Sequence, residues 1–344
     1  MGLGSKIIYK ALETGYIPVR LTKLWMKFLL FRANRYSSFG DTDVRNSVAR
    51  QISQDLLSGK TFQQRGYNRF ANHDLPLDSF QFFLGKYFNF ACGYFSTGAE
   101  DLDEAEENAL WMVSDKSRIR DGMTILEIGC NNGALSRYLA KSFSTCRIIS
   151  VTDSNKSLSL LNKLAENEKI TNVEYLACDY ADIKDKKFDR IICLERFDLI
   201  SCKPNWEKKI KALLNPDGLF FLQTPVHYAY AYYADSVGLE DFPGNNIISE
   251  DVTPSFRTHM LTNSDLQLKD CWEVSGEHYK KTADKWFRKF VFNKEPILKS
   301  MQSAYGKKDA KLWYERWKLY LLGLYEKFGY NRGQNWVIGQ YLYR

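Results

Sequence analysis

The sequence predicts an α/β fold built on a mainly parallel sheet, and three observations support this prediction. From residue 116 onward, apolar β-type segments alternate with helical ones, one strand and one helix in about thirty residues. The first such unit, MTILEIGCNNGALSRYLA (residues 123–140), joins an apolar run to a helix through a turn rich in glycine and asparagine. The final stretch, residues 335–344, alternates apolar and polar residues, as a strand returning to the sheet does. Together they predict a Rossmann-like sheet with right-handed crossovers.

The elements can be assigned in chain order. Residues 1–60 and 279–329 have helical periodicity, and an acidic helix is expected to start at Asp101 or Asp103. Residues 225–262 have the character of an insertion over the sheet edge. The helices of the alternating region are predicted over residues 134–142, 158–168 and 206–214. Its strands are predicted over residues 124–128, 146–152, 173–177, 188–195, 216–224 and 266–275.

Composition excludes several classes of protein. The chain has 344 residues and a net charge of +7, with acidic residues interspersed among the basic ones and no dense basic stripe, so no nucleic-acid partner is expected. Seven scattered cysteines without a CxxC pair predict neither a zinc site nor a disulfide framework, and they fit a reducing, cytoplasmic compartment. No apolar run reaches the length of a membrane span.

One N-terminal helix is basic and amphipathic. A face of this kind packs on the body of the protein or on a second subunit, which is the favoured interpretation, or else touches an acidic membrane surface. The oligomeric state stays open. The apolar positions are Leu21, Leu24, Trp25, Phe28 and Phe31, beside Lys23, Lys27 and Arg32.

The turn after the first predicted strand has the features of an S-adenosylmethionine (SAM) site. Gly129, Asn131 and Gly133 let backbone N–H groups and a helix N-terminus approach a ligand closely. Glu127 precedes the turn, where SAM sites carry a carboxylate. The spacing GxNxG also differs from the dinucleotide pattern GxGxxG. The cofactor expected here is therefore SAM.

Further cofactor contacts follow from the ends of the strands, because ligands of an open parallel sheet lie beyond the carboxyl ends of its strands. Thr152 and Asp153 follow the second strand, where a carboxylate matches the two vicinal hydroxyls of a ribose. Asp179 and Tyr180 follow the third, where a carboxylate can accept from the adenine amino group. Either aspartate can instead cap a helix, and the choice between Thr152 and Asp153 stays open.

Segments along most of the chain carry a family resemblance. They are HDLPLDSFQFFLG, ACGYF, DLDEAEENAL, LEIGCNNGALSRYLA, FDRIICLERFD, LNPDGLFFLQT, SGEHYKKTADKW and FGYNRGQNW. On these segments the chain resembles the coclaurine N-methyltransferase family, whose wider relatives are the cyclopropane-fatty-acid synthases and mycolic-acid methyltransferases. The resemblance implies a class I SAM-dependent methyltransferase. Its expected parts are a helical N-terminal extension and lid (1–100), a Rossmann-like SAM-binding core (101–235), and cap helices with the returning strands (236–344).

The resemblance also implies catalytic residues, with departures. Amine methylases of the family show Glu-x-x-Glu-His after the fourth strand, and here the window is Glu195-Arg196-Phe197-Asp198-Leu199. Glu195 and Asp198 are thus expected to orient or deprotonate an amine, while the family's histidine is lost.

A second set of residues comes from the lipid-modifying relatives, which hold a bicarbonate base with a Cys, a Glu, a His and a Tyr. The counterparts would be Cys92, Asp198, Gln223 and Tyr279, so this set lacks a histidine as well. Cys92, Gln223 and Tyr279 are expected to shape the substrate site. His227, four residues after Gln223, is an alternative base.

The cofactor contacts depart from the relatives too. The Tyr-Ser pair that touches SAM in the lipid-modifying relatives is Phe90-Ala91 here, which removes two hydroxyls. Ala91 and Tyr94 remain the expected contacts from this segment. Asn131 replaces the middle glycine of the loop and tolerates a left-handed backbone, and Ser157 replaces the glutamine of the ribose contact.

The leading functional prediction is N-methylation of a small aromatic amine or alkaloid-like molecule. Such a transfer needs alignment of the two reactants, and a base only to expose the amine lone pair. A fatty-acyl or phospholipid substrate is the first alternative. The second is a SAM-fold protein that has lost or changed its methyl transfer. No metal is expected in any of these.

Overall fold

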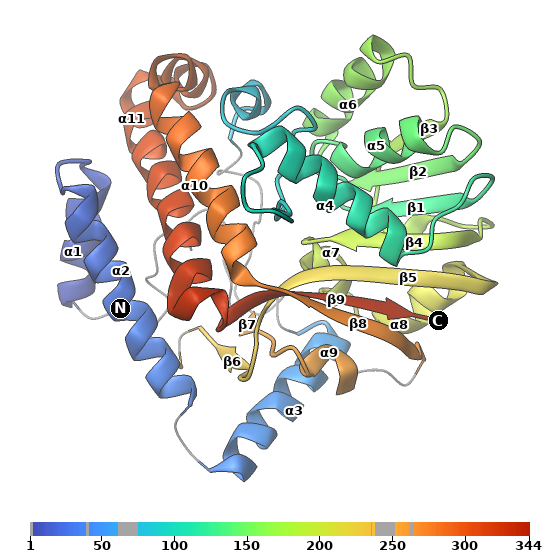
Figure 1. Ribbon diagram of the computed structural model, residues 1–344, viewed down its shortest axis with the longest axis horizontal. Helices are drawn as coiled ribbons and strands as arrows, with labels where there is room; N and C mark the ends of the chain where they lie inside the picture. Colours follow the sequence, from blue (N-terminus) through green and yellow to red (C-terminus); the bar gives the residue numbers. More distant parts are fainter. Residues whose placement is uncertain (1–2, 39–40, 61–74, 235, 238–251, 262–264) are drawn as a thin grey trace.

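A seven-stranded sheet forms the centre of the structure, a computed structural model that describes residues 3–344 except 39–40, 61–74, 235, 238–251 and 262–264 (Figure 1). The strand order is β3-β2-β1-β4-β5-β9-β8. The parallel strands are β1 (Thr124–Ile128), β2 (Arg147–Thr152), β3 (Val173–Ala177), β4 (Phe188–Leu194) and β5 (Leu214–His227). β9 (Trp336–Tyr343) runs antiparallel to β5, and β8 (Leu268–Val274) antiparallel to β9. The strand order reverses between β1 and β4, which places the ligand crevice at their carboxyl ends.

The predicted strands and crossover helices are confirmed, with small shifts at their ends. β5 continues to His227, three residues beyond the prediction, because its pairing with β9 extends to the His227–Trp336 pair. The helix after β1, α5 (Ala134–Ser142), has the predicted bounds. α6 (Asn155–Asn167) starts earlier than predicted because the Ser154 side chain caps it by accepting from Ser157 N. α8 (Trp206–Leu213) precedes β5.

Helices before and after the core surround one end of the sheet. α4 (Leu102–Lys116) covers one face beside α5 (Figure 1), and Asp101 caps it in a reciprocal capping box with Glu104. α10 (Gly276–Phe292) and α11 (Lys294–Gly329) pack against each other, with α1 (Leu3–Glu13) and α2 (Val19–Ser37) beside α11. The remaining helical elements are α3 (Thr42–Ser58), η1 (Leu77–Phe82), η2 (Tyr180–Asp182), α7 (Phe197–Ser201), α9 (Thr258–Leu261) and η3 (Tyr330–Gly333).

The predicted insertion over residues 225–262 lies partly outside the described residues. Its described part contains the two-stranded ladder of β6 (Tyr232–Tyr233) and β7 (Val252–Thr253). No helix in the described part of the chain combines the length and apolar character needed to cross a membrane.

The prediction for the outer face of α2 is wrong in one respect. α2 turns Met26, Leu29, Leu30 and Ala33 into the protein, and Trp25 is half-buried. Four residues of the face expected to pack on the body or on a second subunit are instead more than half exposed in this chain, namely Leu21, Leu24, Phe28 and Phe31, and packing on a second subunit stays a prediction. Both faces of the helix carry apolar residues, so periodicity alone could not tell which of them is buried in the protein.

Candidate active site

A pocket of about 350 Å³ lies at the carboxyl ends of β1, β2 and β3. It is lined by Thr152, Asp153, Asp179 and Tyr180, four of the predicted cofactor residues, together with Lys203. A smaller cavity next to it is lined by other predicted cofactor residues, namely Ala91, Glu127, Gly129 and Asn131. The sheet therefore brings most of the predicted cofactor residues to one crevice.

The turn between β1 and α5 is left-handed at three positions, Gly129 (φ 78°), Asn131 (φ 47°) and Gly133 (φ 72°). Asn131 thus adopts the conformation that its glycine counterpart would take at lower cost. A Cβ atom on Gly133 would lie 2.6 Å from Leu161 Cδ2, so close packing against α6 also requires glycine there. The turn exposes backbone N–H groups at the N-terminus of α5, an arrangement suited to a polar ligand.

Glu127 lies beneath this turn and is buried. Its carboxylate accepts a hydrogen bond from the Ser150 hydroxyl at 2.8 Å. Burial raises the pKa of Glu127 to about 7, against the effect of hydrogen bonds from Ser150 and Ser136. The side chain therefore changes charge near neutral pH.

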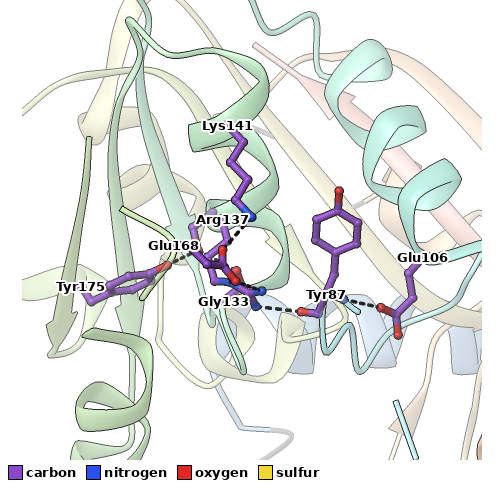
Figure 2. Close-up of polar contacts among 8 residues, drawn as sticks. Tyr87, Glu106, Gly133, Arg137, Lys141, Glu168 and Tyr175 are labelled. Atoms are coloured by element: carbon purple, nitrogen blue, oxygen red, sulfur yellow. Dashed lines mark hydrogen bonds and ion pairs between the residues drawn. The ribbon is translucent and has the colours of Figure 1, made fainter. Parts of the chain in front are cut away.

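The segment before α4 is tied to the turn by a chain of polar contacts through Tyr87 (Figure 2). Glu106 of α4 accepts from Tyr87 N at 3.0 Å, and the Tyr87 carbonyl accepts from Arg137 of α5 at 3.0 Å. Arg137 is almost fully buried and pairs with Glu168 at 2.6 Å, which also pairs with Lys141 at 2.9 Å. These contacts hold residues 85–95 over the SAM-type turn.

Asp153, one of the two predicted ribose ligands, is bound to a side chain that sequence reasoning did not assign. The Arg196 guanidinium donates to Asp153 Oδ2 at 3.2 Å and to Asn131 Oδ1 at 3.0 Å. The same guanidinium donates to Asp198 Oδ1 through Nε at 3.3 Å. Arg196 lies over Gly129, where a Cβ atom would be 2.6 Å from Arg196 Cβ. Arg196 lies between the catalytic candidates Glu195 and Asp198 in the sequence. This position was the only indication that it would contact the site.

Asp179 takes the capping role, one of the two that the sequence left open, and its contact with adenine stays a prediction. It caps η2 by accepting from Ala181 N at 2.9 Å, and its other oxygen pairs with Lys203. It also lines the large pocket, with Tyr180 buried behind it. Burial raises the pKa of Tyr180 well above its ordinary value, so the phenol stays neutral.

The carboxylate of Glu195, a predicted catalytic group, is the centre of a second cluster of polar contacts. Oε1 accepts from Cys92 N at 2.9 Å and from Gln223 Nε2 at 3.0 Å. Oε2 accepts from the Tyr279 hydroxyl at 2.9 Å. Glu195 directly follows β4 and lies in the left-handed region (φ 54°), a strained conformation for a non-glycine residue. Burial raises the pKa of this carboxyl, and the three donors oppose that shift.

The candidates Cys92, Gln223 and Tyr279 thus meet Glu195, whereas Asp198 had been expected among them. The Asp198 carboxylate pairs with Arg196. The two carboxylates therefore have different neighbours. Glu195 is bound by neutral donors, and Asp198 is bound by a guanidinium.

Two histidines near the crevice are held by backbone groups. His227 Nδ1 accepts from Ala229 N and Tyr230 N, and burial lowers its pKa to about 3. The predicted alternative base is therefore already engaged in holding a turn. His278 Nδ1 accepts from Phe95 N, and its ring stacks on Tyr94 with centroids 4.6 Å apart.

The donor set fits S-adenosylmethionine. The predicted match runs along the crevice. The glycine turn and the Glu127 carboxylate beneath it suit the amino-acid part, the aspartate beyond β2 suits the ribose, and the aspartate beyond β3 suits the adenine. Arg196 donates to Asp153 and Asn131 at the predicted ribose end, so its guanidinium would share or release Asp153 if hydroxyl groups bound there.

Comparison with known proteins agrees with this geometry. A family model described as mycolic acid cyclopropane synthetase matches residues 62–337. The (S)-coclaurine N-methyltransferase of Thalictrum flavum subsp. glaucum is 27% identical over 98% of this chain and 95% of its own length. The cyclopropane-fatty-acyl-phospholipid synthase of Escherichia coli K12 is 25% identical over 64% of this chain and 55% of its own length.

Among solved structures, a coclaurine N-methyltransferase bound to N-methylheliamine and S-adenosylhomocysteine superposes with a TM-score of 0.86, covering 99% of this chain and 98% of that one, at 23% identity. At this identity the likeness shows the fold. The chain therefore belongs to the mycolic acid cyclopropane synthetase family and has the fold of a class I SAM-dependent methyltransferase.

Proposed function

We propose that this protein transfers a methyl group from S-adenosylmethionine to the nitrogen of a small aromatic or alkaloid-like amine. The observation that supports the amine is the Glu195 carboxylate. The three donors that the described residues bring to it, from Cys92, Gln223 and Tyr279, are all neutral. A carboxylate with neutral partners keeps its negative charge for a cationic amine. The coclaurine N-methyltransferase relative supports the same substrate class.

When bound, S-adenosylmethionine supplies an electrophilic methyl group, which the amine nitrogen takes as the carbon–sulfur bond breaks. An amine arrives mostly protonated, so one proton must leave before its lone pair is available. Glu195 attracts the ammonium and accepts that proton, and its raised pKa makes it a stronger base than an exposed glutamate. Cys92, Gln223 and Tyr279 position the carboxylate for this step.

Aromatic rings next to Glu195 suit the rest of such a substrate. Tyr279 stacks on Phe328 with centroids 4.2 Å apart and meets Trp286 edge-on at 6.0 Å. Phe90, next to the cofactor contact Ala91, stacks on Trp286 at 5.0 Å. These rings are buried or partly buried and packed on one another, and such packing excludes water from the reaction.

Methyl-label transfer tests this proposal. Purified protein would be incubated with methyl-labelled SAM and either ring-bearing primary and secondary amines or unsaturated phospholipids. Label on an amine nitrogen is expected. Label in lipid alone would favour the fatty-acyl alternative, and cofactor binding without any transfer would indicate a changed or lost activity. Either result contradicts the proposal.

We also propose that the outer face of α2 contacts anionic lipid. Leu24 and Phe28 are 63% and 59% exposed, and they share this face with Leu21 and Phe31. The helix, VRLTKLWMKFLLFRANRYS, carries five cationic side chains and no acidic one. Lys23 and Lys27 pair with Glu326 of α11, whereas Arg20 and Arg35 are exposed, so two copies meeting on this face would bring like charges together. Charge therefore favours an anionic surface over a second subunit.

Vesicle co-sedimentation tests the contact. The protein should sediment with phosphatidylserine-containing vesicles, and Phe28→Glu should abolish this. The matched control is Phe292→Glu, at an apolar side chain 88% exposed at the end of α10, which should keep binding. Equal loss in both variants, or no binding by the wild type, would overturn the assignment. We propose a cytoplasmic location, since all seven cysteines are thiols outside any disulfide.

A further inference from the structure

A line of hydrogen-bonded side chains runs from Glu195 across the sheet to α4. Gln223 donates to Glu195 through Nε2, and its own Oε1 accepts from Gln340 Nε2 at 2.7 Å. The Oε1 atom of Gln340 accepts from Lys116 Nζ at 2.6 Å. The line thus links the reacting carboxylate to a cation at the C-terminal end of α4.

The sheet register sets up this line within an otherwise apolar layer. Gln223 on β5 pairs directly with Gln340 on β9, which pairs with Trp272 on β8. Directly paired residues point to the same face of a sheet. Their neighbours two positions away on that face, Phe221 and Leu342, are fully buried apolar residues. Gln340 is 0% exposed and Gln223 is 3% exposed, so each buried amide needs its partners.

Lys116 determines the direction of the whole line, because an ammonium group can donate hydrogen bonds but cannot accept them. Gln340 must therefore present its oxygen to Lys116 and its NH2 group to Gln223. Gln223 in turn presents its oxygen to Gln340 and its NH2 group to Glu195. With the cation absent, both amides could reverse, and a carbonyl oxygen would then face the Glu195 carboxylate.

We propose that Lys116 and Gln340 are positioning residues that hold the Gln223 amide with its donor toward Glu195 and so keep Glu195 ionised. The catalytic role of these residues rests on the proposed function, in which the ionised Glu195 carboxylate accepts the proton of the amine. Neither residue touches the reacting atoms.

Of the three donors that the described residues bring to Glu195, the Gln223 amide is the one that can change its direction. Burial raises the pKa of Cys92 and of Tyr279, so both stay neutral beside Glu195. Burial lowers the pKa of Lys116, while the neighbouring charges of Asp115 and Asp270 oppose this shift. The Lys116 ammonium also lies 5.1 Å from the centroid of the Trp272 ring, which keeps it in place.

Gln340→Glu is the sharpest test because it changes one atom type and keeps the shape. A carboxylate at this position accepts from Lys116 and also from Gln223, so the Gln223 amide reverses and turns its oxygen to Glu195. Glu195 then favours its protonated form. Methyl transfer should fall on the acid side of the pKa of Glu195, about tenfold for each unit by which the substitution raises that pKa, and recover as the pH rises.

Lys116→Met and Lys116→Arg form a matched pair. Methionine removes the donor and should shift the pH profile in the same direction as Gln340→Glu. Arginine keeps a group that can only donate and should restore the wild-type profile. A merely structural role would lower the rate equally at all pH values, so the shape of the profile separates the two. Thermal unfolding would first confirm that each variant folds.

A titration of Glu195 itself separates this inference from the proposed function. In protein labelled with carboxyl-¹³C glutamate, the Glu195 resonance is assigned by its absence in Glu195→Gln and followed with pH. A higher pKa in Gln340→Glu and Lys116→Met, with the wild-type value in Lys116→Arg, is expected even if no amine is methylated. An unchanged pKa in the first two variants would overturn the inference, whatever the activity.

Discussion

Glu195 and Arg196 are consecutive residues, yet they belong to two regions with opposite electrostatics. On the substrate side, the Glu195 carboxylate is surrounded by neutral donors. On the cofactor side, the Arg196 guanidinium neutralises Asp153 and Asp198. The left-handed backbone at Glu195 separates the two side chains.

This difference shows which carboxylate is available to an amine. A carboxylate already paired with a guanidinium offers little additional attraction to a second cation. Among the described residues, Glu195 has only neutral donors and keeps that attraction. Of the two carboxylates in the Glu-x-x-Asp window, the first is therefore suited to chemistry, while the second helps to hold Arg196.

The largest change in cofactor affinity should come from disturbing the cofactor side alone. In Gly129→Ala, a left-handed residue would gain a Cβ atom 2.6 Å from Arg196 Cβ. Affinity for S-adenosylhomocysteine should fall on the order of 30-fold, measured by titration calorimetry. Gly122→Ala is the control, because Gly122 has a similar φ of 82° with nothing within 4 Å of the added atom. Equal losses in both variants would mean that backbone strain, and not the contact with Arg196, sets the affinity.

A smaller loss is expected on the substrate side. Tyr279→Phe removes one donor from the Glu195 carboxylate, and methyl transfer should fall about tenfold while cofactor affinity is unchanged. Tyr341→Phe serves as the control, because that hydroxyl donates to the Phe256 carbonyl. A changed cofactor affinity in Tyr279→Phe would break the separation between the two regions.

The smallest effect should follow from releasing Asp153. Arg196→Met keeps an apolar side chain over Gly129 and frees the carboxylate for ribose hydroxyls. Cofactor affinity should rise about threefold, the scale of a partly exposed ion pair. Weaker binding would show that Arg196 itself holds the cofactor.

Much of the fold could be predicted, since strand and helix periods, capping residues and glycine turns are local signals. The β1 and α5 bounds agree with the prediction, and Asp101 caps α4 as expected. Periodicity did not indicate which apolar face of α2 is buried, because that depends on the partner helix α11. The division into parts at residues 100 and 235 stays a prediction.

The sequence indicated candidate residues of the site, but it did not indicate which of them would be hydrogen-bonded to one another. Strand ends identified Asp153, Asp179 and Gln223 because parallel strands bring their carboxyl ends together. The sequence could not show that Arg196 would neutralise Asp153, since the two residues lie 43 positions apart. Nor could it show the line from Gln223 to Lys116, which depends on the register of β5 against β9.

The central claim, that Glu195 and not Asp198 receives the amine, is tested most directly by single-turnover methyl transfer in Glu195→Gln and Asp198→Asn across pH. Burial raises the pKa of Glu195, and the ionised form is the active one, so the wild-type rate should fall as the pH drops through that raised pKa. In Glu195→Gln the rate should fall about a hundred- to ten-thousandfold, and its decrease at low pH should disappear. In Asp198→Asn the rate should fall about threefold or less and should still decrease at low pH. The reverse result, a collapse in Asp198→Asn with Glu195→Gln active, would contradict the account.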